Sequence, residues 1–163
     1  MDSASRLRII IPGPATPERK RSRVINGHAG RSDTPEAKSY KNHVKACAAA
    51  AMDGRAPLEG PLALEVVVYR LRPKSAPKRV TLPITKPDVD NYIKILSDSF
   101  TGIVWRDDAQ IVRLRATKLF AETCRVEALI STVDSPEELR EEEWREEQAR
   151  EAAAAESNVP LAM

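Results

Sequence analysis

The sequence predicts a single domain that contains both strands and helices, followed by a charged C-terminal helix, within a chain of 163 residues. Three observations lead to this fold class. Segments rich in β-branched residues alternate with segments of helical periodicity, a chain of this length can bury a core without disulfides, and acidic residues concentrate in the last thirty positions. We therefore expect a domain over residues 1–133 and an acidic helical extension over 134–163.

The N-terminal third predicts one strand and one helix. Residues 6–11 form the strand, which Pro12 and Gly13 end. The basic segment 17–32 has no clear periodicity, and we expect a mobile loop. Thr34 can cap a helix that begins with Pro35 and runs to about residue 52. Its apolar face consists of Tyr40, Val44, Cys47, Ala48 and Ala51.

The middle of the chain predicts three more strands and a second helix. Residues 62–71 are the clearest strand, and a proline-punctuated basic connection follows it. The second helix starts near Asp88, runs to about Phe100 and stops at Gly102. Residues 111–120 and 124–131 predict two adjacent strands joined by a short turn. In the first of these, Val112, Leu114, Ala116 and Phe120 share one face, and Arg113 and Arg115 point the other way.

The C-terminal segment has a clear helix start. Ser135 is placed as N-cap, Pro136 as the first helical residue and Glu138 as the third position of a capping box. Leu139 and Trp144 are the large apolar residues of the stretch that follows. Two interpretations stay open: a solvated helix, or a helix that docks through these two side chains.

Charge is divided unevenly along the chain. Residues 134–163 hold ten acidic and three basic side chains, whereas residues 1–133 hold 14 acidic and 23 basic ones. The body therefore carries a balance of +9 and the tail −7. A basic body is typical of proteins that bind a polyanion such as nucleic acid, although solubility alone also explains it.

The segment KPDVDNYIK at residues 86–94 and the segment WRDDAQI at 105–111 carry the candidate chemistry. Asp88 falls at or near the start of the second helix and Asp90 in its first turn, where the helix dipole favours negative charge. Helix capping is the simpler explanation of one such residue. Two carboxylates followed by a later Asp pair also suit Mg²⁺, which prefers hard oxygen ligands.

Lys94 lies one helical turn after Asp90. A lysine beside a metal site can stabilise the charge that develops on a phosphate. The alternative is a simple ion pair between residues four apart, worth only ~0.3–0.5 kcal/mol.

Together, the two segments resemble the motif of RusA-type Holliday junction resolvases, a family also common in phage and prophage genomes. The resemblance is contiguous over residues 86–112 and weaker over about 6–131. It implies that Asp88, Asp90 and Asp108 are metal-binding and catalytic carboxylates and that Lys94 is the essential lysine. Asn91, Asp107 and Gln110 match supporting positions, which orient the neighbouring groups.

The resemblance further implies a compact α+β domain with a mixed sheet packed by helices, acting as a homodimer. A two-fold dimer suits a four-way junction, which is cut on two opposing strands. The implied reaction is hydrolysis of a phosphodiester with Mg²⁺, or Mn²⁺ in its place, in DNA recombination and repair. A catalytically silent junction-binding protein and a less selective flap or fork nuclease are the alternatives.

Other partners are judged from the sequence directly. No phosphate-binding glycine loop is present, so no nucleotide cofactor is expected. No run of about 18 apolar residues predicts a membrane span, and two cysteines suit a reducing, cytoplasmic location. The expected DNA contacts lie in the basic stretches that flank the acidic motif: Arg19, Lys20, Arg21, Arg23, Lys74, Lys78, Arg79 and Lys86.

Overall fold

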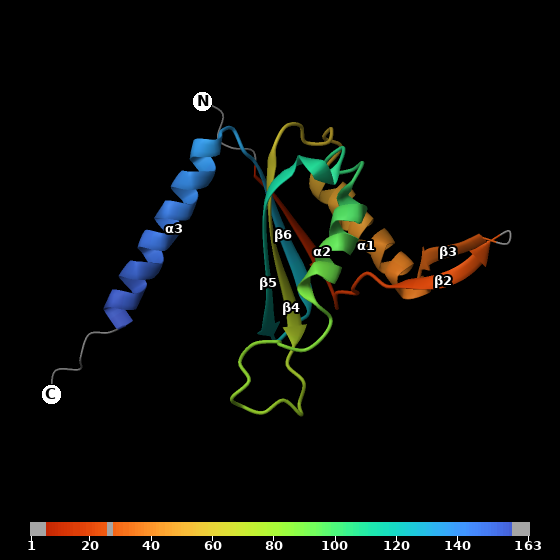
Figure 1. Ribbon diagram of the computed structural model, residues 1–163, viewed down its shortest axis with the longest axis horizontal. Coiled ribbons are helices and arrows are strands. Elements are labelled where there is room, and N and C mark those ends of the chain that lie inside the picture. The colour runs from red at the N-terminus through yellow and green to blue at the C-terminus, as the bar shows by residue number, and fades with distance from the viewer. Residues whose placement is uncertain (1–5, 26–27, 158–163) are drawn as a thin grey trace. The chain divides into compact units, whose positions relative to one another are not determined.

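The computed structural model describes residues 6–25 and 28–157 (Figure 1). The chain divides into two compact units, residues 1–132 and residues 133–163, and each is described by itself. The first unit contains six strands, two α-helices and one 3-10 turn, η1; the second contains α3. The elements are β1 (Arg6–Pro12), β2 (Lys20–Ile25), β3 (His28–Asp33), α1 (Pro35–Met52), β4 (Leu62–Leu71), α2 (Val89–Phe100), η1 (Asp108–Gln110), β5 (Ile111–Ala121), β6 (Arg125–Thr132) and α3 (Pro136–Ser157).

A four-stranded mixed sheet in the order β1-β6-β4-β5 forms the centre of the first unit. β6 pairs antiparallel with β1 and β4, while β4 and β5 are parallel. The expected α+β class with a mixed sheet is thereby confirmed. The expectation that the last two strands are adjacent is wrong: β4 lies between β5 and β6. β5 and β6 are consecutive in sequence but do not pair with each other. Instead, the backbone groups of β4 form hydrogen bonds with β5 along one edge and with β6 along the other.

One face of the sheet is covered by α1 and α2 (Figure 1). The register aligns Leu7, Ile130, Leu64 and Leu114 in one row across the four strands. The first three are at most 4% exposed, whereas Leu114 is 50% exposed. Leu114 lies on β5, one of the two edge strands of the sheet.

The helices of this unit match their predicted limits. In α1, the Thr34 side chain accepts a hydrogen bond from the Ala37 amide, and Pro35 is the first residue. The buried stripe of α1 includes Tyr40, Val44 and Ala48; Cys47 and Ala51 are partly buried at its margin. α2 begins after Asp88 and ends at Phe100, as the sequence predicts.

The basic segment after β1 is not the loop that the sequence suggested. It contains β2 and β3, which form a two-stranded antiparallel ribbon with Ile25 opposite His28. The register leaves the dipeptide Asn26-Gly27 between the strands, and this dipeptide is a strong hairpin signal in a sequence. The missing apolar alternation concealed the strands, and none of their described side chains belongs to the main core.

The second unit contains α3. The Glu138 amide donates to Ser135 Oγ at 3.2 Å, as in the expected cap. The Glu138 carboxylate accepts from the Asp134 amide at 2.9 Å, one residue before the position that a standard capping box uses. No helix in the described part of the chain is long and apolar enough to span a membrane.

Candidate active site

Asp88 occupies the N-cap position of α2, but its side chain makes no capping hydrogen bond. Its backbone is extended, with φ −71° and ψ 150°, and its carboxylate accepts no hydrogen bond from the first turn. The carboxylate is exposed. Capping, the simpler explanation of an Asp at this position, is therefore not how the fold uses this side chain.

Two basic side chains of the sheet hold the segment that leads into Asp88. Lys118 Nζ donates to the carbonyl oxygens of Pro87 at 2.9 Å and Thr85 at 3.2 Å. The Arg70 guanidinium donates to the carbonyls of Thr85 at 3.2 Å and Lys86 at 3.3 Å. Three successive carbonyls are thus bonded to cations near the carboxyl ends of the parallel strands β4 and β5. These bonds fix where α2 begins and where Asp88 lies.

The Asp107-Asp108 pair lies at the start of η1, and the fold uses its two members differently. Asp107 Oδ1 accepts from the Ala109 amide at 2.8 Å, and Gln110 Oε1 accepts from the amides of Arg106 and Asp107 at 2.9 and 3.2 Å. Gln110 Nε2 also donates to the carbonyls of Leu58 and Gly60, both at 3.0 Å. Asp107 and Gln110 therefore hold the turn, while Asp108 presents an exposed carboxylate.

A buried aromatic pair anchors the chain between α2 and η1. Trp105 and Phe100 are both 0% exposed, and their rings meet edge to face at 5.4 Å. Trp105 Nε1 donates to Thr101 Oγ1 at 3.2 Å. Gly102 makes the turn between them with φ +81°, a backbone conformation that favours glycine. The position of Asp108 is thus set by the core.

Four charged side chains of the predicted site have no partner among the residues that the structure describes. Within residues 6–25 and 28–157, the side chains of Asp88, Asp90, Lys94 and Asp108 have neither a hydrogen bond nor an ion pair. All four are exposed. The ion pair between Asp90 and Lys94 that the alternative interpretation requires is absent in this part of the chain, so this alternative does not account for Lys94.

The predicted site residues fall into two groups along α2. Asp88 and Asn91 line a cavity of about 290 Å³ at its amino end, and Lys94 and Asp108 line another of about 310 Å³ beside its second half. Asp88 and Lys94 are six residues apart, which corresponds to ~9 Å along the helix axis. Accordingly, no three His, Cys, Asp or Glu side chains in the described regions gather closely enough to hold a metal ion.

Two of the predicted DNA contacts lie beside the first of these groups. Arg19 and Lys86 line the same cavity as Asp88, one from each flanking basic stretch. Lys20 pairs with Glu18 at 3.1 Å, and Arg21 lies on β2. Lys74, Lys78 and Arg79 are exposed on the connection between β4 and α2. The side chain of Arg23 lies outside the residues that the structure describes.

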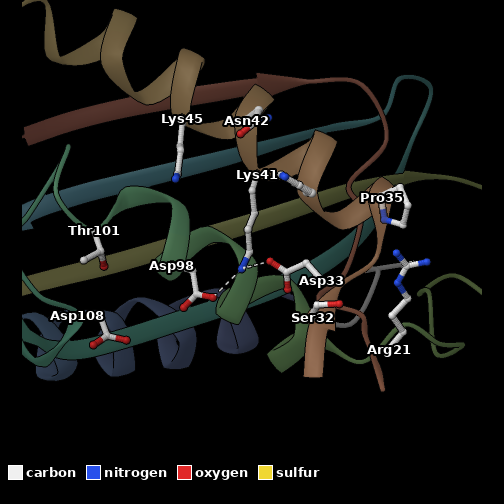
Figure 2. Close-up of a pocket in the computed structure, with 11 residues that line it drawn as sticks. Arg21, Ser32, Asp33, Pro35, Lys41, Asn42, Lys45, Asp98, Thr101 and Asp108 are labelled. Atoms are coloured by element: carbon white, nitrogen blue, oxygen red, sulfur yellow. Dashed lines mark hydrogen bonds and ion pairs between the residues drawn. The ribbon is translucent and has the colours of Figure 1, made fainter. Parts of the chain in front are cut away.

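A larger groove, of about 920 Å³, was not expected from the sequence (Figure 2). It runs beside α1 and includes Asp108. Its basic residues on α1 are Lys38, Lys41 and Lys45. Their spacing of three and four residues places them on one face of the helix, and this periodicity was the available sequence signal.

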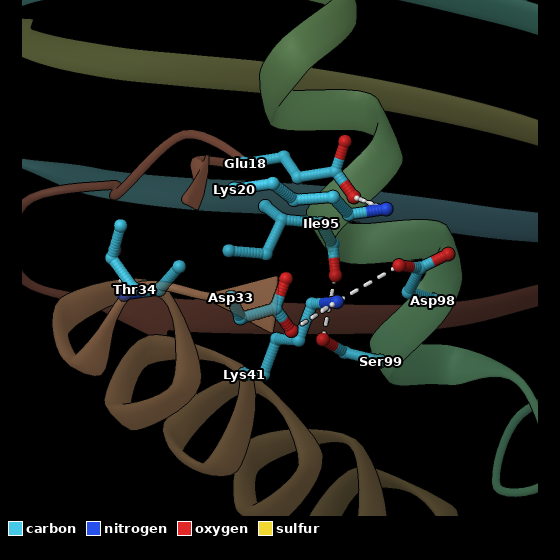
Figure 3. Close-up of polar contacts among 9 residues, drawn as sticks. Glu18, Lys20, Asp33, Thr34, Lys41, Ile95, Asp98 and Ser99 are labelled. Atoms are coloured by element: carbon cyan, nitrogen blue, oxygen red, sulfur yellow. Dashed lines mark hydrogen bonds and ion pairs between the residues drawn. The ribbon is translucent and has the colours of Figure 1, made fainter. Parts of the chain in front are cut away.

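Lys41 forms ion pairs with two carboxylates within this groove. Its Nζ lies 3.0 Å from Asp33 Oδ2 and 2.9 Å from Asp98 Oδ2, so it joins β3, α1 and α2 (Figure 3). Burial alone lowers the pKa of Lys41, but hydrogen bonds and charge attraction from the two carboxylates outweigh it and raise the pKa above its ordinary value. Lys41 is therefore charged and fixed in place.

Comparison with known proteins adds a family to this geometry. Residues 12–131 match the model of the family described as endodeoxyribonuclease RusA. A protein of Bacillus subtilis (strain 168), described as uncharacterized protein YqaN, is 34% identical over 132 residues. That alignment covers 75% of this chain and 92% of the relative. The region that matches the family contains every residue of the two groups along α2.

Proposed function

The chain belongs to the RusA endodeoxyribonuclease family, and from this membership we propose that it is a structure-selective DNA endonuclease that resolves Holliday junctions. The observation that carries the proposal is a set of four exposed charged side chains that have no partner within the described residues. No hydrogen bond or ion pair within the described chain involves the side chains of Asp88, Asp90, Lys94 and Asp108. By contrast, the side chains of Asp107 and Gln110, next to Asp108, are hydrogen-bonded within the turn. Exposed groups that the fold does not use are available to a substrate.

We propose Mg²⁺, with Mn²⁺ as a substitute, as the cofactor. The donor chemistry fits, because Asp88, Asp90 and Asp108 offer hard carboxylate oxygens that no group of the described chain occupies. Mg²⁺ usually takes only one or two carboxylates and keeps several waters, so a pair such as Asp88 and Asp90 meets its needs without a three-residue cluster. When bound, the ion would supply a Lewis acid and an activated water.

The chain's own residues then have distinct roles in phosphodiester hydrolysis. The carboxylates hold the cofactor, and Lys94 stabilises the negative charge that develops on the phosphate oxygens. Asp107 and Gln110 hold the backbone of Asp108, and Asn91 supports the start of α2. The oxygen of water bonds to phosphorus, the 3′ oxygen leaves with a proton, and the products carry 5′-phosphate and 3′-hydroxyl ends.

We further propose that the enzyme acts as a homodimer in the cytoplasm, in DNA recombination and repair. A four-way junction has two opposing strands of equivalent geometry, and a two-fold dimer presents two equivalent sites to them. Residues 134–163 are proposed as an extension outside the catalytic domain.

A synthetic four-way junction tests the proposal. The protein is incubated with the labelled junction, with and without Mg²⁺, beside a linear duplex, a flap and a fork of the same sequence. Paired symmetric cuts in the junction, dependent on the metal, are expected. Binding without cleavage under all metal conditions would show a silent junction-binding protein instead, and equal cleavage of the flap or fork would show a less selective nuclease.

A further inference from the structure

The groove beside α1 is lined by charged side chains of two kinds: some are ion-paired within the protein, and others have no partner among the described residues. Lys41 is bonded to Asp33 and Asp98 at its floor. Lys38 and Lys45 are exposed, and neither has a carboxylate partner among the described residues. At the end of the same groove lies Asp108, the uncommitted carboxylate of η1 (Figure 2). The available charges thus include two lysines along the groove and one candidate catalytic residue at its end.

The spacing of the two lysines suits a nucleic-acid strand. Lys38 and Lys45 are seven residues apart on α1, which corresponds to ~10 Å along the helix axis. Phosphates repeat along a nucleic-acid strand at a spacing shorter than this, so two phosphates of one strand can contact the two lysines.

Arg21 extends the basic lining onto the β2–β3 ribbon. It lines the groove opposite the end that holds Asp108, and the Lys41 ion pairs hold the end of β3 against α1 and α2 (Figures 2 and 3). The groove therefore has a fixed floor with basic side chains on two walls.

We propose that this groove binds the sugar–phosphate backbone of a DNA strand through Lys38 and Lys45 and leads that strand to Asp108. The proposal rests on the proposed nuclease function and deepens it, since it adds a DNA-binding surface on α1 to the contacts expected from residues 19–23 and 72–86. Contacts to phosphates carry no sequence information, so the groove would position DNA of any sequence.

The test measures binding to the four-way junction without metal, so that cleavage does not enter. The dissociation constant is measured between about 50 and 200 mM salt for the full-length protein, for Lys38→Ala, for Lys45→Ala and for the double variant. The control is Arg6→Ala, which removes an equal charge from an exposed position on β1. Each phosphate that is no longer neutralised should lower the slope of log affinity against log salt by about 0.9, so the double variant should lower it by about 1.8 for each groove occupied.

The Lys38→Arg/Lys45→Arg variant should restore the slope, because it keeps both charges. If the slopes for Lys38→Ala and Lys45→Ala equal that of Arg6→Ala, the proposal that the groove binds DNA is wrong. Failure of the groove proposal is distinguishable from failure of the proposed nuclease function. If the wild type cuts junctions and the lysine variants bind like the control, only the groove is wrong. If the alanine variants show the smaller slope while the wild type never cuts DNA, the groove stands and the catalytic assignment is wrong.

Discussion

Asp107 and Asp108 show how neighbouring residues of one type acquire different roles. The first accepts a hydrogen bond from the Ala109 amide and is held by Gln110, whereas the second is exposed and has no side-chain partner in the described chain. A carboxylate that already caps a turn is a weaker metal ligand, because binding would cost its hydrogen bonds. The local geometry thus supports the assignment of the second Asp as the proposed ligand.

Asp90→Asn should abolish cleavage and leave junction binding equal or tighter. The substitution keeps the shape of the side chain, removes one proposed ligand charge and lowers repulsion toward phosphate. Cleavage rates and dissociation constants are measured in parallel, with Glu122→Gln as a control that removes a negative charge from the turn between β5 and β6. Cleavage by Asp90→Asn within about tenfold of the wild type would contradict its role as a ligand.

Lys94→Ala should lose most of the activity without unfolding the protein. The side chain is exposed and unpaired in the described chain, so its removal should change the free energy of unfolding by less than ~0.5 kcal/mol. A cation that acts only in the transition state is worth ~10²-fold or more in rate. Single-turnover cleavage and a thermal melt measure both quantities, and Arg6→Ala is the matched control. Unchanged cleavage would leave Lys94 as an ordinary surface residue.

At the level of elements, α2 connects the two halves of the candidate site. Its amino end is fixed by Lys118 and Arg70, which bond the preceding carbonyls. Its carboxyl end is fixed by the packing of Phe100 against Trp105. The rest of the helix is anchored by its buried face, so Asp90 and Lys94 are presented on a rigid support.

Lys41 should stabilise the junction of α1, α2 and β3. In Lys41→Met the stem of the side chain is kept, but Asp33 and Asp98 lose their shared cation. We expect a loss of about 1–3 kcal/mol in the free energy of unfolding at pH 7, measured with denaturant. The control is Lys38→Met, an exposed residue one turn earlier, which should change stability by less than ~0.5 kcal/mol. Equal effects of the two substitutions would contradict the structural role of Lys41.

The same ion pairs predict a pH dependence. The carboxylates raise the pKa of Lys41 in the folded state, so its contribution is fully present below the unfolded value of about 10.4. The contribution disappears as pH rises through the folded value. The stability difference between the wild type and Lys41→Met should therefore stay constant from neutral pH to about pH 10 and shrink above it. A difference that shrinks on acidification within the neutral range would assign the effect to another group.

At the level of the whole molecule, the uneven charge predicts a role for residues 134–163. Their balance is −7, whereas that of the body is +9, so the tail can compete with DNA for the basic surface. Deletion of these residues should leave a folded protein that binds DNA more tightly, with a steeper salt dependence. A titration and a thermal melt of the truncated protein measure the two effects.

A charge variant separates this prediction from a structural role of the tail. Replacing Glu141, Glu146 and Glu147 with Gln keeps the length and the apolar residues Leu139 and Trp144, and it should reproduce part of the tighter binding. Aggregation or a large drop in melting temperature after deletion, with no effect of the Gln replacements, would show that the tail docks through its apolar side chains.

The sequence by itself determined the main helices and strands and the motif. Local signals act within a few residues: Thr34 and Pro35 start α1, β-branched residues form β4, and Asp88 precedes α2. The RusA resemblance rested on a contiguous motif over residues 86–112, and the family match over residues 12–131 bears it out. The order of side chains along the chain was sufficient for these predictions, because neither caps nor motifs depend on distant partners.

Only the tertiary structure decided which strands pair and which charged side chains are bonded within the protein. The insertion of β4 between β5 and β6, the β2–β3 ribbon and the Lys41 ion pairs depend on which elements come together in space. The division of the site between two cavities along α2 and the groove beside α1 likewise depend on how the elements pack. Such arrangements are selected by the burial of the whole core and by the satisfaction of its polar groups, which no local stretch of sequence contains.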